Sequence, residues 1–215
     1  MFGGVFFMRI NKVTTVLALT AFLLLCGCGP WPPIVDTKRD IERLPVSETS
    51  VRARGLADID IPSLAHLRQL RTLDFSGGNA VESARITDSG LARLSKLNLP
   101  HLETLTLGYC ANITDAGLAH VGQMHTVSWL SLMACPQITD AGLSHLLTMR
   151  SLTALDLRGC PGITDSGLQH LAVKTNWQTI LLGGCSNVTV DGVARLQVAL
   201  PNSKVEKDEK EWSGH

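Results

Sequence analysis

Four cysteines stand 25 residues apart, at Cys110, Cys135, Cys160 and Cys185. Thiols at a regular spacing can bind zinc, pair as disulfides or pack in a core. If each belongs to one coil of a stack whose strands lie about 4.8 Å apart, the four span roughly 15 Å, whereas zinc needs its sulfur ligands at about 2.3 Å. We therefore expect no metal site and interpret the four as structural buried thiols. Disulfides between neighbouring coils are the alternative, because an exported protein permits them, although parallel side chains oppose the required dihedral angle.

Three histidines keep the same step, and arginines hold the equivalent positions before and after them. No carboxylate recurs beside the histidines, so a metal ladder is not indicated. We interpret the row as a partly exposed helix position, with a pH-sensitive cationic stripe facing an anionic glycan or lipid as the alternative. The sequence has no nucleophile-elbow, zinc-protease, phosphate-loop or dinucleotide motif. It therefore predicts a protein without catalytic residues or cofactors, and an active site assembled from distant coils is disfavoured. The row is Arg93, His120, His145, His170 and Arg195.

The spacing extends to the residues around the cysteines, in the pattern L-x-x-L-x-L-x-x-C followed by I-T-D-x-G-L. One repeat reads Leu102, Leu105, Leu107 and Cys110, and then residues 113–118. The L-x-L alternation predicts a short strand with one apolar face, and the second motif predicts a capped helix start. A single coil cannot bury its leucines alone, so a fixed period in this range indicates stacked repeats. The expected fold is an α/β solenoid with a parallel sheet on the concave face and helices on the convex face.

These motifs, over residues 70–193, resemble the cysteine-containing leucine-rich repeat subfamily in a bacterial form. The resemblance implies a horseshoe-shaped binding scaffold and no reaction. In eukaryotes this repeat is found in substrate receptors of ubiquitin ligases, which carry an F-box before the repeats. Here an apolar segment and a proline-rich stretch precede the repeats, so a ubiquitin-ligase adaptor is the disfavoured alternative.

The N-terminal residues carry an export signal. Arg9 and Lys12 precede an uncharged apolar run over residues 13–25, which is shorter than the roughly 20 residues of a membrane span. The following Leu25-Cys26-Gly27-Cys28 resembles the bacterial lipobox, and that resemblance implies lipid attachment at Cys28. We expect an exported lipoprotein, at the outer membrane or the periplasmic face rather than in the cytoplasm. An uncleaved anchor helix is the alternative, and the true start is either Met1 or Met8.

The sequence therefore predicts four segments. Residues 1–28 form the signal peptide, residues 29–50 a proline-rich tether, residues 51–205 the repeat domain with terminal caps, and residues 206–215 a charged tail. Prolines favour an extended backbone over a helix in the tether. Lys+Arg and Asp+Glu each total 19, so no net charge attracts nucleic acid.

A binding surface is expected on the concave face, where the variable strand positions point outward. Exposed aromatics flanked by polar groups are typical of interface hot spots. We predict a non-enzymatic scaffold of the cell envelope that binds a macromolecule on this concave face. The preferred partner is a protein, and a glycan is the alternative. The rival interpretation is a structural envelope component that assembles through its repeats. The predicted contact residues are Thr104, Thr106, Tyr109, Trp129, Ser131, Met133, Asp156 and Arg158.

Overall fold

A computed structural model describes residues 32–53, 55–77 and 85–207 of the chain. The chain divides into two units, Met1–Pro32 and Pro33–His215, and the described strands and helices belong to the second. The strands are β1 Ser50–Arg52, β2 Thr72–Asp74, β3 Thr104–Thr106, β4 Trp129–Ser131, β5 Ala154–Asp156, β6 Thr179–Leu181 and β7 Lys204–Glu206. The helices are α2 Lys38–Glu42, the 3₁₀ helix η1 Asp58–His66, α3 Asp88–Leu94, α4 Asp115–Val121, α5 Asp140–Leu146, α6 Asp165–Ala172 and α7 Val190–Ala199.

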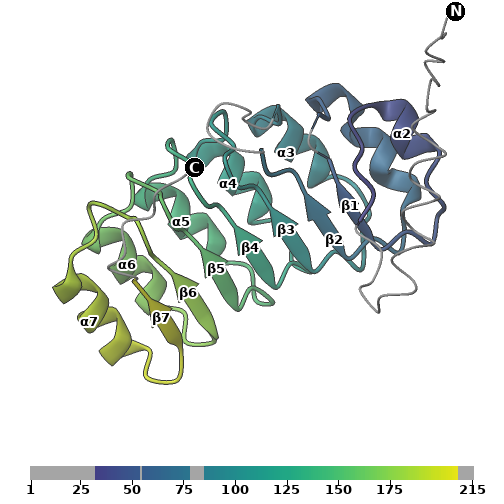
Figure 1. The fold of residues 1–215 in the computed structure, drawn as a ribbon. Helices are drawn as coiled ribbons and strands as arrows, with labels where there is room; N and C mark the ends of the chain where they lie inside the picture. The colour runs from purple at the N-terminus through teal and green to yellow at the C-terminus, as the bar shows by residue number, and fades with distance from the viewer. Residues whose placement is uncertain (1–31, 54, 78–84, 208–215) are drawn as a thin grey trace, which may run out of the picture. The chain divides into compact units, whose positions relative to one another are not determined.

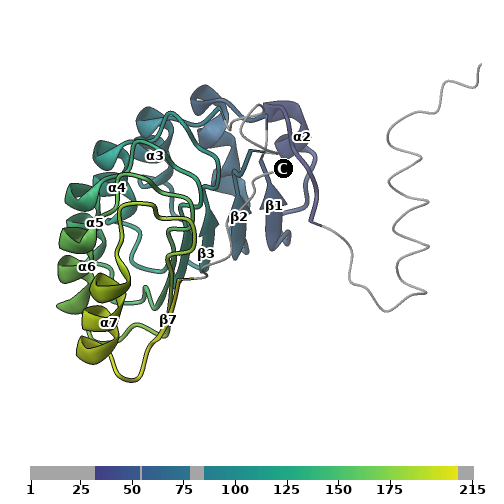
Figure 2. The same cartoon turned by 60° about the vertical axis from the view of Figure 1, so that its left-hand side comes forward.

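The seven strands form one parallel sheet in sequential order, β1 to β7. Helices α3 to α7 lie in a second layer behind it, one per coil, and the sheet lines the inner side of the curved stack (Figures 1 and 2). The register advances by one coil at each step, so Leu105 pairs with Leu130 and Leu130 with Leu155. The fold is the leucine-rich repeat solenoid that the 25-residue period predicts.

The core is a continuous aliphatic spine between the two layers. The central strand leucines and the leucine two residues later are at most 1% exposed in the coils of β3 to β5. The apolar helix positions, such as Leu118 and Leu143, close the spine from the other side and are fully buried. Burial of this kind stabilises by about 25 cal/mol per Å² of apolar surface, and here it is available only when coils stack.

The I-T-D-x-G-L motif connects each coil to the next. Its Thr is the N-cap of the helix, as Thr139 is for α5, where it accepts a hydrogen bond from the Ala141 amide. Its Asp accepts two hydrogen bonds from the Thr of the following coil. Asp115 Oδ1 accepts one from the Thr139 amide at 2.9 Å, and Asp115 Oδ2 accepts the other from the Thr139 hydroxyl at 2.5 Å. The same pair of bonds joins Asp58 to Thr87, Asp88 to Thr114, Asp140 to Thr164 and Asp165 to Thr189.

The glycine of the motif makes room for this bond. A methyl group placed on Gly142 would lie 2.3 Å from Asp115 Oδ1, and one on Gly167 would lie 2.2 Å from Asp140 Oδ1. Those distances are far inside van der Waals contact, so any side chain there would displace the carboxylate of the preceding coil. The Thr, Asp and Gly of successive motifs therefore form a row of contacts between adjacent coils along the helix layer, which we call the Thr–Asp–Gly ladder.

The expected tether differs from the structure over residues 33–50. Thr37 and Asp40 form a capping box that starts α2, and Val35 and Ile41 are buried in the core. Residues 33–35 also pair with β1, because the Val35 amide donates to Arg52 O and the Arg52 amide to Pro33 O. The predicted boundary is therefore wrong: the folded unit begins at Pro33, and the N-terminal cap includes α2. The predicted signal peptide, with Cys28, lies outside the described residues.

Candidate functional site

The candidate site is the concave face of the sheet, where strand residues one and three of each coil form two parallel rows. Trp129 lies in the centre of the first row, between Thr104 of β3 and Ala154 of β5. Its neighbours are small, and the side chain of Trp129 is partly exposed. The first row is Ser50, Thr72, Thr104, Trp129, Ala154, Thr179 and Lys204, and the second is Arg52, Asp74, Thr106, Ser131, Asp156, Leu181 and Glu206.

Two of the predicted contact residues are buried. Asp156 is 2% exposed and Ser131 is 5% exposed, whereas alternation along the strand predicts that both face outward. The guanidinium of Arg158 covers Asp156, with Nε 2.9 Å from Oδ1 and Nη2 2.8 Å from Oδ2, and the Ser131 hydroxyl donates to Oδ2 at 3.3 Å. Arg158 is the partly exposed member of this group, and the buried carboxylate of Asp156 holds its guanidinium in place.

Tyr109 and Met133 lie together at the carboxyl ends of β3 and β4. The Tyr109 amide donates to Met133 O at 2.8 Å, and both side chains are partly exposed. Met133 follows Trp129 by four residues, so about 13 Å of extended chain separates them. The structure thus brings Tyr109 and Met133 together and leaves Trp129 at a separate position, in the same coil as Met133. Thr104 and Thr106 are also partly exposed, on either side of Leu105.

Tyr109 has an uncommon backbone conformation. Its φ is 59°, and the next coil has φ 55° at Ala134, while the following two coils have glycine, with φ 68° at Gly159 and 73° at Gly184. The turn therefore requires the left-handed region, which costs an L-residue about 1 kcal/mol or more. Two coils carry a side chain at this strained position, and one of these side chains is the only tyrosine in the sequence. Strain of this kind is found preferentially at functional sites.

The four repeat cysteines are free and buried. Each of the last three donates its thiol hydrogen to the preceding coil: Cys135 to Leu107 O at 3.0 Å, Cys160 to Leu132 O at 3.1 Å and Cys185 to Leu157 O at 3.0 Å. Burial raises the pKa of Cys135 to about 12 and raises the pKa of the other three thiols as well. A thiol that resists ionisation is a poor nucleophile and a poor metal ligand, so these groups act as small core residues.

The histidine row lies on the helix layer, away from the sheet. His145 and His170 are exposed and His120 is partly exposed, near the ends of α5, α6 and α4. Within the described part of the chain, no group of three His, Cys, Asp or Glu side chains is arranged to hold a metal ion. No helix of that part is both long and apolar enough to cross a membrane.

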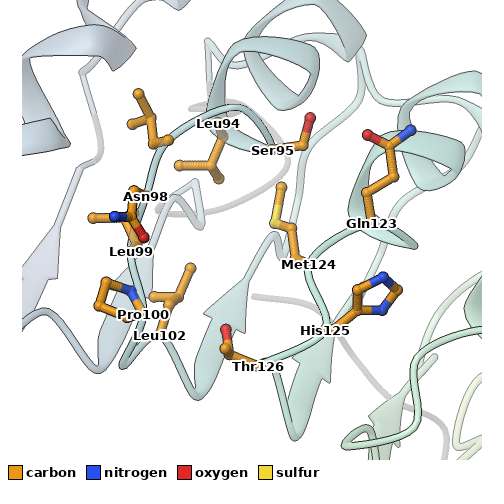
Figure 3. A pocket seen from close by; sticks show the side chains of 11 residues that line it. Leu94, Ser95, Asn98, Leu99, Pro100, Leu102, Gln123, Met124, His125 and Thr126 are labelled. Carbon is orange, nitrogen blue, oxygen red and sulfur yellow. The ribbon is translucent and has the colours of Figure 1, made fainter.

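A small cavity that was not predicted from the sequence lies where the chain enters β3 and β4. It encloses about 180 Å³ and has an apolar floor of Leu94, Leu102 and Met124 (Figure 3). Asn98 and Leu99 belong to a loop two residues longer than its counterpart in the next coil. That insertion was the available signal. The other lining residues are Ser95, Leu97, Pro100, Gln123, His125 and Thr126.

Comparison with known proteins agrees with the fold. The family model described as Leucine Rich repeat matches residues 98–120 and 148–172. Internalin C2 from Listeria monocytogenes is similar in structure, with 21% identity and a TM-score of 0.50 over 78% of this chain and 65% of that one. A leucine-rich repeat protein of Leptospira interrogans has 14% identity and a TM-score of 0.49 over 78% and 38%, and a second Listeria monocytogenes internalin has 21% and 0.46 over 85% and 53%.

The chain thus spans less than two thirds of each of these three structures, and at such identities the likeness concerns the fold alone. No curated protein matches the sequence significantly. The protein is a leucine-rich repeat solenoid, a class whose members generally act as protein-interaction scaffolds.

Proposed function

We propose that the protein is an exported, lipid-anchored scaffold of the cell envelope that binds a protein partner through the concave face of its sheet, without catalysis. The observation that carries the proposal is the partly exposed Trp129 at the centre of that face. Trp is the residue most often enriched at interface hot spots, and it is effective where its surroundings exclude charge.

The surroundings of Trp129 have that character. From Thr72 to Thr179 the first row of the sheet contains no charged residue. Charge enters in the second row, at Asp74 and at Asp156 beneath Arg158, and in the end strands, at Arg52, Lys204 and Glu206. An apolar centre with a polar and charged rim matches the anatomy of a protein interface, and Arg158 supplies an anchored cation for orientation.

The membrane anchor rests on residues 9–28. A basic start, a 13-residue apolar run and Leu25-Cys26-Gly27-Cys28 support processing before Cys28 and acylation of its thiol. Mass spectrometry of the mature N-terminus tests this directly. We expect an acylated Cys28, loss of processing in Cys28→Ala and unchanged processing in Cys26→Ala. An unmodified Cys28 at an intact N-terminus would refute the anchor.

The binding proposal is tested by cross-linking the protein in its envelope fraction and measuring partner affinity with the purified components. We expect the double variant Trp129→Ala/Tyr109→Ala to lose the cross-linked partner, with Kd raised by about tenfold or more. Thr179→Ala, in the same row but two strands away, is the matched control and should bind normally. Equal affinity in wild type and the double variant would exclude the concave face as the site.

A glycan partner is the alternative, because an aromatic ring among hydroxyl side chains also suits a sugar. Enzymatic removal of glycans from the fraction before cross-linking separates the two: a protein partner is still captured and a glycan is not. The structural-component alternative predicts that Trp129 becomes buried when the protein associates with itself, which its fluorescence would report.

A further inference from the structure

The two ends of the stack are finished differently. At the N-terminal end, a single bridge joins Ile34 to Arg52 of β1: the Pro33 carbonyl and the Val35 amide bond to Arg52, so the backbone of Ile34 faces outward there. At the C-terminal end, β7 is the last strand of the sheet, and no described strand pairs with its outer side. Within the described residues this edge is unpaired, and an unpaired strand edge can serve as a template for another chain.

The backbone of Val205 faces that open edge. The Lys204 amide donates to Gln178 O, and Glu206 O accepts from the Leu182 amide, so both flanking residues point their polar groups toward the β6 side. Successive residues of a strand direct these groups to opposite edges, so the N–H and C=O of Val205 point outward. The Val205 side chain packs on the core, while the side chains of Lys204 and Glu206 lie together on the other face as an ion pair.

The outer face of α7 is apolar where inner helices are polar. Val190 occupies the position that the aspartate of the Thr–Asp–Gly ladder has in other coils, so α7 presents no carboxylate at this position. The side chain of Val190 is 67% exposed. Val198 lies two turns further along the same side and is 82% exposed, with the exposed Ala194 between them. In α6 the residues corresponding to Val190 and Ala194 are Asp165 and Gln169, which line the space between α6 and α7. The residue corresponding to Val198 is Val173, which is 76% exposed although a further coil follows it. Within the apolar triplet of α7, Val190 and Ala194 thus occupy the side that a further coil would cover, and Val198 lies beside that side.

We propose that this end binds a second copy of the chain, with β7 pairing antiparallel to β7 of the partner and α7 packing against α7 of the partner. Both triplets are self-complementary under a two-fold axis. With Val205 on the axis, each Lys204 lies opposite Glu206 of the partner subunit, and with Ala194 near it, each Val190 lies opposite Val198 of the partner subunit. Strands about 4.8 Å apart and helices 8–10 Å apart are the spacings of adjacent coils, so the second copy would continue the stack.

The interface would be small. One helix face and one three-residue strand offer less than the roughly 800 Å² per partner of a standard interface, so we expect a Kd in the micromolar range. The dimer would leave the concave face open, because the contacts lie at the end of the stack. The inference is therefore independent of the binding function proposed for Trp129.

A charge-swap series tests the inference in the full chain, with the dimer fraction measured by sedimentation equilibrium over about 1–200 μM, a range that brackets a micromolar Kd. Lys204→Glu and Glu206→Lys each place like charges opposite one another twice per dimer, so we expect each to weaken dimerisation by about fivefold or more. The double swap Lys204→Glu/Glu206→Lys restores complementarity and should return the wild-type dimer. Circular dichroism confirms that each variant is folded.

A second variant addresses the helix. Val198→Asp should abolish dimerisation within the same concentration range, whereas Val46→Asp, at another exposed valine near the other end of the stack, should leave it intact. Trp129→Ala should also leave it intact. A wild-type protein that stays monomeric at 200 μM, through cover by the residues after Lys207 or by another molecule, overturns the inference. So does a dimer lost in Trp129→Ala, or one indifferent to both the charge swap and Val198→Asp.

Discussion

At the residue scale, the turn after the strand has one residue with positive φ, which is glycine in two coils and a residue with a side chain in two others. Gly159 and Gly184 adopt this conformation without a Cβ, whereas Tyr109 and Ala134 adopt it with one. A side chain kept at such a position in spite of its cost is a candidate for contact with a partner, as with Tyr109. A methyl group offers little contact, so Ala134 should show the cost alone.

The cost can be measured at Ala134. Because its φ is 55°, Ala134→Gly should raise the free energy of unfolding by about 0.5–1 kcal/mol, the strain relieved less the entropy that glycine gains in the unfolded chain. Urea denaturation followed by circular dichroism gives the value. The reverse change, Gly184→Ala at φ 73°, should destabilise by a similar amount. A destabilised Ala134→Gly would show that the methyl group makes contacts worth more than the strain.

The thiols provide a second residue-scale prediction. Because burial raises the pKa of Cys135 to about 12, we expect the four repeat thiols to resist a maleimide reagent at pH 8 in the native protein and to react after unfolding in urea. Mass spectrometry after digestion assigns the reaction to each cysteine. Rapid native labelling of Cys135 or Cys160 would contradict the buried position of the row.

Single residues were the least predictable level. Alternation predicts that Ser131 and Asp156 face outward. Arg158 folds back over the carboxylate of Asp156, which also accepts a hydrogen bond from Ser131, and both of these residues are buried. A local pattern gives the direction of a side chain, and its exposure depends on what a neighbour does. The role of Asp115 was also missed, because its partner Thr139 lies 24 residues away and only the coil spacing brings them together.

At the element scale, the Thr–Asp–Gly ladder makes a sharp energetic prediction. Asp115→Ala removes two hydrogen bonds to Thr139 and should cost about 1–3 kcal/mol. Gly142→Ala should cost about 1–3 kcal/mol, because the new methyl group meets Asp115 Oδ1. In the double variant the new methyl group no longer meets a carboxylate. The loss of unfolding free energy should therefore be smaller than the sum of the two single losses by about 1 kcal/mol or more. Urea denaturation of the four proteins provides the cycle, and simple additivity would show that the two residues act independently.

The ladder also predicts a dependence on pH at its last rung. The hydroxyl of Thr189 donates to Asp165 and holds the pKa of that carboxyl below its ordinary value of 3.8. A carboxyl with a lower pKa in the folded state stabilises the fold above its unfolded pKa, and this contribution is lost as the pH falls through the folded pKa. We expect stability to decline below about pH 4, and Asp165→Asn to lessen that decline while lowering stability at pH 7. Thermal unfolding from pH 2 to 7 tests this, with the exposed Asp191→Asn as control.

Helices and strands were the most predictable level, because the same sequence motif recurs in each coil and predicts the same elements each time. The L-x-L alternation predicts strands such as β3 and β4, and the threonine before each helix is its cap, as at Thr114 and Thr164. The end elements are less regular. Helix α2 was missed because its five residues bury only Ile41, and the prolines around it indicated an extended chain.

At the scale of the whole molecule, a stack in which each coil touches only its neighbours has local stability. The N-terminal cap should therefore protect the first coils and not the last. Ile41 is fully buried, and α2 packs on η1, so the cap covers the leucines that the first coil would otherwise expose. A stable fold that began only at residue 51 would not need this side chain.

The last prediction follows from this locality. Ile41→Ala should cost the cap about 2–4 kcal/mol and speed amide hydrogen exchange in η1, β1 and β2, while α6 and α7 keep their native protection. Val46→Ala, an exposed valine four residues beyond α2, is the control and should change neither region. Exchange that rises equally from β1 to β7 would mean that the stack opens as one cooperative unit. Unchanged exchange at η1 would mean that α2 adds nothing to the stack, and that the chain before β1 acts as the tether its prolines suggested.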